Sequence, residues 1–220
     1  MTRLPIEAAG ESLWLLPSGT VWWPATGTLF AADLHLGKGA AFRAQGQAVP
    51  AGGSTRTLAR LDELVMAHDV AQLVVLGDFW HEADGLTPSL LDDVAAFATR
   101  VPTVLVLGNH DRRIHPPGLP LRVVNSTLPL GPLTAAHEPP PAGTPGFTLA
   151  GHWHPAIQLT SRAGDRLRRP CFVHYPHALV LPAFGGFTGA LTLRHGELAR
   201  AAAKVAVLAD GDLHWLPPGR

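Results

Sequence analysis

The chain has 220 residues, of which 46% are hydrophobic, and its formal net charge at neutral pH is +0. A chain of this length and hydrophobic content can bury a substantial core, so intrinsic disorder is not expected. The balanced charge argues against binding of nucleic acid through bulk positive charge, although a local basic patch stays open.

Cysteine content and hydropathy indicate the compartment. Cys171 is the only cysteine, so no intramolecular disulfide can form, as is usual in a reducing compartment. Residues 1–16 lack the basic and then apolar pattern of an export signal, and no uncharged apolar segment reaches the roughly 18–20 residues that a membrane span needs. We expect a cytoplasmic protein with no membrane segment, folded as a single domain over residues 1–220.

The first half of the sequence alternates strands and helices. Apolar runs at 13–16 and 20–23 predict a hairpin, followed by a strand at 28–32 and a helical turn at 40–44. Helices are expected over residues 54–68, capped by Ser54, and over 88–100, started by Thr87 with Pro88 at its first position. Fully apolar runs at 73–76 and 104–107 predict strands covered on both faces, and this order indicates a parallel sheet.

The second half is rich in proline and glycine and is expected to contain only short strands. They are predicted at residues 121–124, 133–136, 147–150, 157–159, 171–173, 179–181 and 191–193. We expect them to form a second, more antiparallel sheet that packs against the first.

Polar residues follow the predicted strands directly. Asp33 and His35 lie two residues apart, so in an extended segment they would point to one side and could share a metal ion; a surface pair is the alternative. Asp78 follows Gly77 at the carboxyl end of a buried strand, where open α/β sheets bind ligands. A turn or helix-capping aspartate is the alternative there.

The next strand ends in three further polar residues. The side-chain oxygen of Asn109 can ligate a hard cation or form an Asx turn. His110 can donate a proton to a leaving oxygen, and Asp111 can either orient that imidazole or start a helix. His152 and His154 repeat the spacing of two, and their position at a strand end favours ligation.

With His137, these positions make a ligand set of two aspartates, one asparagine and four histidines. Nitrogen and oxygen ligands without sulfur suit two divalent ions such as Mn²⁺, Zn²⁺, Fe²⁺ or Mg²⁺ rather than copper, and Asp78 could bridge them. Two ions roughly 3.5–4 Å apart activate a water nucleophile and neutralise charge that develops on a phosphoryl group.

The blocks Asp33-x-His35, Gly77-Asp78, Gly108-Asn109-His110-Asp111, His137 and Gly151-His152-x-His154 resemble the five motifs of the calcineurin-like metallophosphoesterases. The resemblance implies a four-layered α/β/β/α sandwich with mixed sheets. It also implies that His110 assists the leaving group. It assigns one ion to Asp33, His35, Asp78 and His154, and the other to Asp78, Asn109, His137 and His152. Ala136 departs from the glycine that often precedes the fourth-block histidine of this family.

A narrower resemblance covers residues 32–38, 41–43, 108–113, 168–172 and 181–189. These segments are similar to those of the PdeM-type, ligase-associated DNA damage response phosphoesterases. The resemblance implies a manganese-dependent phosphodiesterase or DNA endonuclease of DNA repair, which hydrolyses phosphodiester bonds with a metal-activated water. It also implies a functional link to a DNA ligase, a DEXH helicase and an exonuclease. The alternative is a phosphodiesterase or pyrophosphatase that acts on small or lipid-linked nucleotides.

Basic side chains follow the metal motifs closely. Lys38, Arg43, Arg112 and Arg113 are expected to line the mouth of the site and contact substrate phosphates, with solvated surface as the alternative. Arginine suits this task because its planar guanidinium binds phosphate in a bidentate manner.

Four further features of the sequence stay open. Trp80 and Trp153 lie within metal motifs and can stack on a base, although core packing is the stronger interpretation. His81 follows Asp78 by three residues and can support the ligands. The basic run at residues 162–169 is expected to be a charged loop, unless it faces the site and follows a nucleic-acid backbone.

Overall fold

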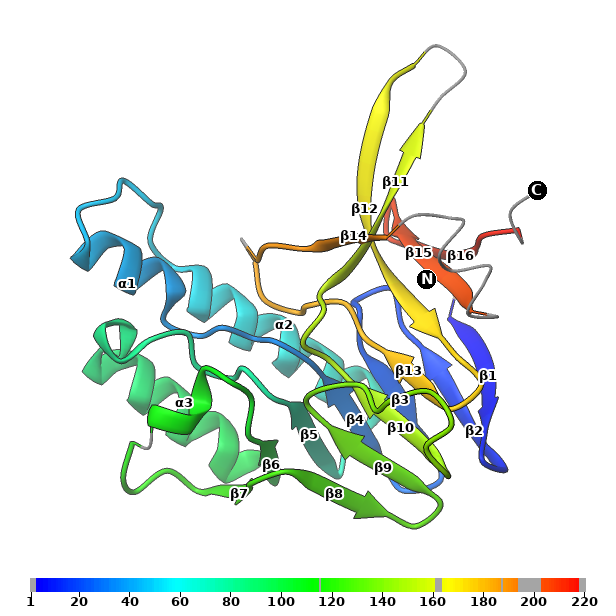
Figure 1. The fold of residues 1–220 in the computed structure, drawn as a ribbon. Coiled ribbons are helices and arrows are strands. Elements are labelled where there is room, and N and C mark those ends of the chain that lie inside the picture. The colour runs from blue at the N-terminus through cyan, green and yellow to red at the C-terminus, as the bar shows by residue number, and fades with distance from the viewer. Residues whose placement is uncertain (1–2, 115, 161–163, 187, 194–202, 218–220) are drawn as a thin grey trace.

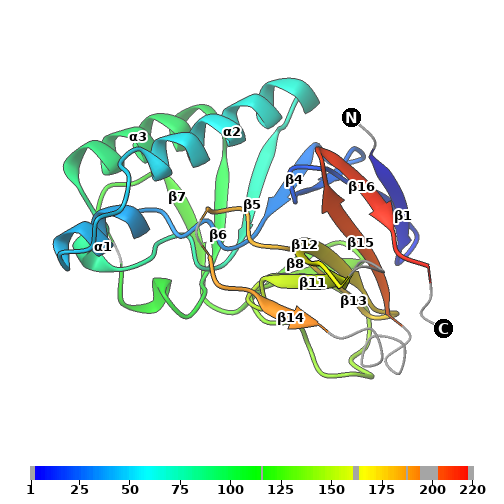
Figure 2. The same cartoon turned by 90° about the horizontal axis from the view of Figure 1, so that it is seen from above.

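The computed structural model of the chain describes residues 3–114, 116–160, 164–186, 188–193 and 203–217. Two β-sheets lie face to face in this structure, and a layer of helices covers the outer face of the first sheet (Figures 1 and 2). The α/β sandwich with mixed sheets is thereby confirmed. Within the described ranges, every helix lies on the side of the first sheet, so the expected outer helical layer beyond the second sheet is not represented there.

The first sheet has the strand order β1-β2-β3-β4-β5-β6-β7. Its strands are β1 Leu4–Ala8, β2 Glu11–Leu15, β3 Val21–Trp23, β4 Thr28–Ala31, β5 Gln72–Leu76, β6 Thr103–Val106 and β7 Leu121–Val124. The strands from β1 to β4 are antiparallel, whereas β4, β5, β6 and β7 run parallel. The assignment of residues 121–124 to the second sheet was wrong, because β7 extends the parallel sheet beside β6.

The helices connect the parallel strands. They are α1 Lys38–Ala44, α2 Gly53–His68 and α3 Pro88–Arg100, with short 3-10 helices η1 Ala83–Gly85 and η2 Asp111–Arg113. Thr87 caps α3 as predicted, since its hydroxyl accepts a hydrogen bond of 3.2 Å from the Leu90 N–H. The predicted cap of α2 was wrong: Gly52 in the left-handed region precedes the helix, and the Ser54 hydroxyl instead accepts a 2.9 Å hydrogen bond from Gly37 N–H. That bond ties α2 to the loop that follows β4.

The second sheet has the order β14-β11-β12-β13-β10-β9-β8, and β15 pairs with both β12 and β16. Its strands are β8 Thr127–Leu130, β9 Leu133–Ala136, β10 Phe147–Ala150, β11 Pro155–Thr160, β12 Arg166–His174, β13 Ala178–Val180, β14 Leu191–Leu193, β15 Lys204–Ala209 and β16 Asp212–Trp215. Antiparallel pairs outnumber parallel ones, but β10 runs parallel to β9 and β13, and β11 runs parallel to β14. Strands β1, β8, β15 and β16 were not predicted.

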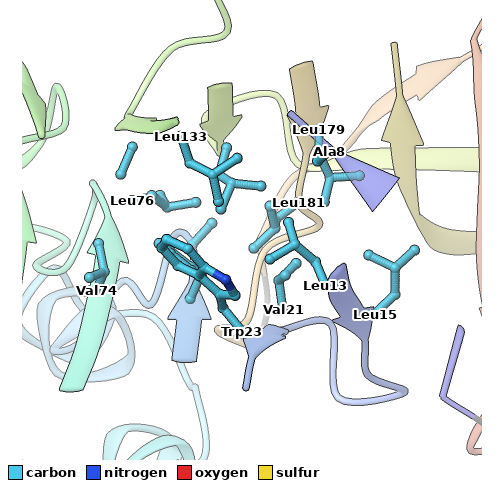
Figure 3. Close-up of a cluster of buried hydrophobic side chains, with 14 of the residues drawn as sticks. Ala8, Leu13, Leu15, Val21, Trp23, Val74, Leu76, Leu133, Leu179 and Leu181 are labelled. Carbon is cyan, nitrogen blue, oxygen red and sulfur yellow. The ribbon is translucent and has the colours of Figure 1, made fainter. Parts of the chain in front are cut away.

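Strand β5 shows how the apolar runs fix the layers. Val74 and Leu76 point into the core between the sheets, where they join Leu133 and Leu181 of the second sheet (Figure 3). The intervening residues Leu73 and Val75 point to the other face, into the core beneath α2 and α3. Because successive side chains of a strand alternate between faces, a strand that is apolar throughout can lie only between two covered faces.

No helix in the described part of the chain is long and apolar enough to cross a membrane.

Leu61 lies at the contact between α2 and the first sheet, and it is fully buried. We predict that Leu61→Ala lowers the free energy of unfolding by about 2–5 kcal/mol, because it leaves a cavity in a packed core. Met66 lies on the same helix with 85% of its surface exposed, so Met66→Ala is the matched control and should change that free energy by less than about 0.5 kcal/mol. Urea denaturation followed by circular dichroism measures both, and equal effects would contradict the assigned burial.

Candidate metal centre

The polar motifs of the sequence all lie in loops that follow the carboxyl ends of five strands. Asp33 follows β4, Asp78 follows β5 and Asn109 follows β6 in the first sheet, while His137 and His152 follow β9 and β10 in the second. The parallel pairing of β4, β5 and β6 brings three of these loops to one edge, and that of β9 and β10 brings the other two together. Direct contacts between side chains of the two sheets show that these two sets of loops meet.

Asp33, His35, Asp78 and His154 form the first group. One ligand atom from each residue lies within 4.8 Å of those of all the others. His154 Nε2 is 3.4 Å from Asp33 Oδ1 and 3.3 Å from His35 Nε2. His35 Nε2 is 4.0 Å from Asp78 Oδ2. Two carboxylates and two imidazoles that point at a common centre can hold a divalent ion.

Asp78, His137 and His152 form the second group, and their ligand atoms also lie within 4.8 Å of one another. His137 Nε2 is 3.6 Å from Asp78 Oδ1, and it is 3.0 Å from His152 Nδ1. Asp78 therefore contributes one carboxylate oxygen to each group. His137 lies in this group although Ala136 precedes it, where the family often has glycine.

Hydrogen bonds fix the ring orientation and the tautomer of two of the imidazoles. His137 Nδ1 lies 2.9 Å from the Leu76 carbonyl, and His154 Nδ1 lies 2.9 Å from the Gly189 carbonyl. A carbonyl accepts only, so Nδ1–H donates in both rings, and a neutral ring then directs the lone pair of Nε2 toward the group. This arrangement is typical of histidines that bind metal ions.

The burial of the groups also fits a cation. Asp33 is fully buried, and burial raises the pKa of its carboxyl, with the nearby Asp78 adding to the rise. Burial also lowers the pKa of His35 to about 2, so this imidazole is neutral and can ligate at physiological pH. Nδ1 of His35 is buried without a hydrogen-bond partner. A divalent cation would offset the burial penalty on the Asp33 carboxylate, because it favours the charged form.

The backbone at the centre adopts an uncommon conformation. Asp33, His35, Asp78, His152 and His154 all have positive φ, from 45° to 69°. The left-handed region costs about 1–2 kcal/mol for a residue with a side chain, and such residues cluster at functional sites. Asp33 and His35 do converge as predicted, but the stated reason was wrong: sharp turns, rather than an extended segment, bring them together.

Glycines at the strand ends allow the close approach of the loops. A methyl group on Gly108 would overlap the carboxylate of Asp78 and its backbone nitrogen. A methyl group on Gly77 would overlap the ring of His137. The two glycines that precede the motifs are therefore required by space, since Asp78 and His137 occupy the volume that a side chain would need.

His110 lies beside the first group, and its imidazole is held from two sides. Its Nδ1 is 2.7 Å from the His81 carbonyl, to which it donates, and its backbone N–H donates to Asp78 Oδ1 at 3.0 Å. The ring stacks on that of His81 with centroids 5.2 Å apart and an interplanar angle of 22°.

Asp111 is fully buried, and it binds backbone rather than the imidazole of His110. Its carboxylate accepts hydrogen bonds from Trp80 N–H at 3.0 Å and from Gly108 N–H at 2.9 Å. These bonds join the loop after β5 to the loop after β6. They favour the second of the two interpretations, since Asp111 begins η2 and fixes loops, while the His81 carbonyl orients His110.

From the sequence, His81 was expected only to support the ligands. It is buried, both of its ring nitrogens lack a hydrogen-bond partner, and its ring meets His35 edge-on with centroids 5.5 Å apart. The ligand atoms of His35, His81 and His110 also lie within 4.8 Å of one another, and they form a third group of this kind. The one sequence signal was its spacing of three from Asp78, which is weak without the fold.

The remaining candidates occupy different surroundings. Asn109 is exposed on the turn between Gly108 and His110, so its role as a ligand stays a prediction. Arg112 and Arg113 are exposed on η2, directly after His110. Lys38 is half-buried and lines a cavity beside His35, described below.

Arg43 has a different environment from the other cations. Its guanidinium donates to the carbonyls of Val49 and Pro50 at 3.3 and 3.2 Å, so it holds the loop after α1. Contact of these four basic residues with substrate is still a prediction.

The two tryptophans and the basic run are not gathered at the metal groups. Trp80 is 1% exposed within the core beneath the helices, and Trp153 packs on the apolar cluster of the second sheet. Core packing was thus the correct interpretation for Trp80. The basic run was wrongly expected to be a loop, because residues 166–169 belong to β12, which forms a hairpin with β11 that stands out from the body (Figure 1). Arg162 lies outside the described residues.

The fold and this centre together define a class. The model of the calcineurin-like phosphoesterase family matches residues 28–170, a range that contains every residue of both metal groups. The chain belongs to this family, as the motif resemblance implied, and it is a metal-dependent phosphoesterase.

Among solved structures, the chain is similar to nuclease MPE of Pseudomonas putida. The two are 38% identical, with a TM-score of 0.81 over 98% of this chain and 100% of that chain. A phosphoesterase of E. coli, YfcE, is 15% identical, with a TM-score of 0.46 over 87% of this chain and 99% of that one. A comparison with curated proteins gave no match.

Gly108→Ala should displace the Asp78 carboxylate without replacing any of the proposed ligand residues. We predict a fall in Mn²⁺ affinity of about ten- to hundredfold, the loss typical of disturbing the partners that hold a metal ligand. Gly53→Ala is the control, since a methyl group there meets open space. Titration calorimetry on the two variants measures the affinities, and equal values would show that Asp78 needs no such space.

Asp111→Asn tests the role of the buried carboxylate. The amide can accept only one of the two backbone hydrogen bonds, so we predict a loss of about 1–3 kcal/mol in the free energy of unfolding. Asp84→Asn, on the exposed side of η1, should leave this free energy nearly unchanged. Chemical denaturation compares them. A stable Asp111→Asn variant with greatly reduced turnover would instead support the orienting role.

Proposed function

We propose that this chain is a dinuclear metal-dependent phosphodiesterase that cleaves DNA, with Mn²⁺ as its working ion. The observation that carries the proposal is the carboxylate of Asp78, whose two oxygens belong to two adjacent groups of ligand atoms. Two ions held this way, when bound, activate a water and neutralise charge that develops on a phosphoryl group.

The proposed ligands divide between the two ions. Asp33, His35 and His154 would hold one ion together with Asp78. His137 and His152 would hold the other with Asp78, and Asn109 would complete that second set. Nitrogen and oxygen donors without sulfur suit Mn²⁺, and they also suit Zn²⁺, Fe²⁺ and Mg²⁺.

His110 would serve the leaving oxygen. Its Nδ1–H is engaged by the His81 carbonyl at 2.7 Å, so the ring can give up a proton through Nε2 only when both nitrogens are protonated. The imidazole then acts as a general acid, and the product leaves as an alcohol.

DNA is proposed as the substrate because the similar Pseudomonas putida protein is a nuclease. Arg112 and Arg113 would meet the backbone phosphates next to His110. We further propose a place in DNA repair, a functional link to a DNA ligase, a DEXH helicase and an exonuclease, and a cytoplasmic location. The repair role and the functional link rest on the narrower sequence resemblance, and the location rests on the single cysteine.

A small or lipid-linked nucleotide is the second candidate substrate. The net charge of +0 favours it, since most nucleic-acid enzymes carry a basic surface. Turnover of single-stranded DNA, duplex DNA, cyclic nucleotides and dinucleoside polyphosphates, compared at equal enzyme concentration with Mn²⁺, distinguishes the two candidates.

Asp78→Ala tests the proposed mechanism. We predict that this change abolishes Mn²⁺-dependent hydrolysis of bis(p-nitrophenyl) phosphate, because both ions lose a ligand. Asp92→Ala removes an exposed aspartate of α3 and should retain wild-type turnover. EDTA should remove the activity of the wild type, and added Mn²⁺ should restore it. Unchanged turnover in the Asp78 variant would refute the two-ion mechanism.

A further inference from the structure

A cavity of about 180 Å³ opens beside the metal centre, between α1, the loop after it and the first turns of α2. His35 forms part of its wall, so this cavity shares a side chain with the first metal group. Its volume is below the roughly 300–1,000 Å³ of sites that enclose whole drug-sized ligands. It therefore suits one part of a larger substrate whose reacting atoms lie at the ions.

The walls combine apolar surface with positive charge. Leu34, Phe42, Val49 and Pro50 supply apolar surface. Phe42 is half-buried, and its ring meets the His81 ring edge-on with centroids 5.6 Å apart, so the aromatic wall continues to the histidines around the first metal group. A planar base can pack against such a wall by stacking and apolar contact.

Three cations line the same cavity, and among the described lining residues there is no carboxylate. Arg60 is used structurally, because it stacks on the Phe184 ring at 4.2 Å and donates to the Phe184 carbonyl at 3.1 Å. Lys38 lies over Phe42 at 5.6 Å from the ring centroid. Arg56 is exposed and gives a long hydrogen bond of 3.3 Å to the Ala51 carbonyl, which uses one of its five donors.

We propose that this cavity binds the nucleoside attached to the scissile phosphate, with the base against Phe42 and the adjoining phosphate at Lys38 and Arg56. The inference rests on the proposed phosphodiesterase activity, because the ions fix where the scissile group lies. A nucleoside fits these walls since it joins a flat, weakly polar ring to an anionic linkage. The cavity would then supply binding of the substrate beyond the reacting group.

Gly186→Leu offers a way to fill the cavity without removing a contact. Gly186 lines the cavity and has an ordinary φ, and a Cβ atom added to it meets no other atom within 4 Å. Phe42→Ala and Arg56→Ala remove the proposed stacking surface and the proposed phosphate contact. Arg100→Ala is the control, because Arg100 is exposed at the end of α3 and pairs with Asp62 away from the cavity.

Two substrates that share a leaving group separate the cavity from the chemistry. Thymidine 5′-(p-nitrophenyl phosphate) carries a nucleoside, and methyl p-nitrophenyl phosphate does not. We expect Gly186→Leu and Phe42→Ala to lower kcat/KM for the thymidine ester by about five- to hundredfold, the size of one stacked base. Arg56→Ala should lower kcat/KM only for a thymidine ester that carries a further phosphate on its 3′ oxygen. Turnover of the methyl ester should stay within about twofold of wild type, and Arg100→Ala should change neither.

A binding measurement decides the proposal independently of turnover. Thymidine 5′-monophosphate is titrated into the Mn²⁺-loaded wild-type protein and its variants by calorimetry, and we expect Gly186→Leu and Phe42→Ala to weaken binding by a similar factor. Equal losses on both esters, or unchanged nucleotide binding in the cavity variants, would overturn the proposal. A wild type that binds the nucleotide in this cavity but hydrolyses neither ester would refute the proposed activity and leave the nucleoside site standing.

Discussion

Two buried carboxylates, those of Asp33 and Asp78, lie at the edge where both sheets end, and the loops around them are arranged to satisfy their charge. The backbone N–H of His152 donates to Asp33 at 3.0 Å, and that of His110 donates to Asp78 at the same distance. Four imidazoles contribute ring nitrogens from the sides. Neutral donors alone compensate buried charge poorly, and a centre of this kind is stable when cations complete it.

The geometry of the backbone follows from that need. The loop that brings the carboxylate of Asp33 and the imidazole of His35 to one point turns sharply, as their left-handed backbone conformations show. The strain is compatible with folding because the strands that lead into the loops are held in packed cores on both faces. The apolar runs of β4, β5 and β6 thus serve the chemistry, since they fix the positions from which the ligand loops start.

Sequence patterns predicted the elements whose signals are local. Thr87 and Pro88 marked the start of α3, and the continuous apolar run of β5 identified a strand with two covered faces. Sequence patterns failed where the structure depends on contacts with residues that are distant in sequence. Residues 121–124 carry no sign that they would extend the parallel sheet. Ser54 has the sequence context of a helix cap, but its hydroxyl accepts a hydrogen bond from Gly37, which lies in another element of the structure. The roles of His81 and Asp111 likewise depend on partners about thirty residues away.

The metal centre also connects parts of the chain that are far apart. Nε2 of His35 and Nε2 of His154 lie 3.3 Å apart although 119 residues separate them in sequence. An ion bound by both would close a long loop as a disulfide does in secreted domains, with the difference that it dissociates when the ion becomes scarce. In a chain whose only cysteine is buried, the supply of divalent ions would then govern how resistant the protein is to proteolysis, as well as whether it turns over substrate.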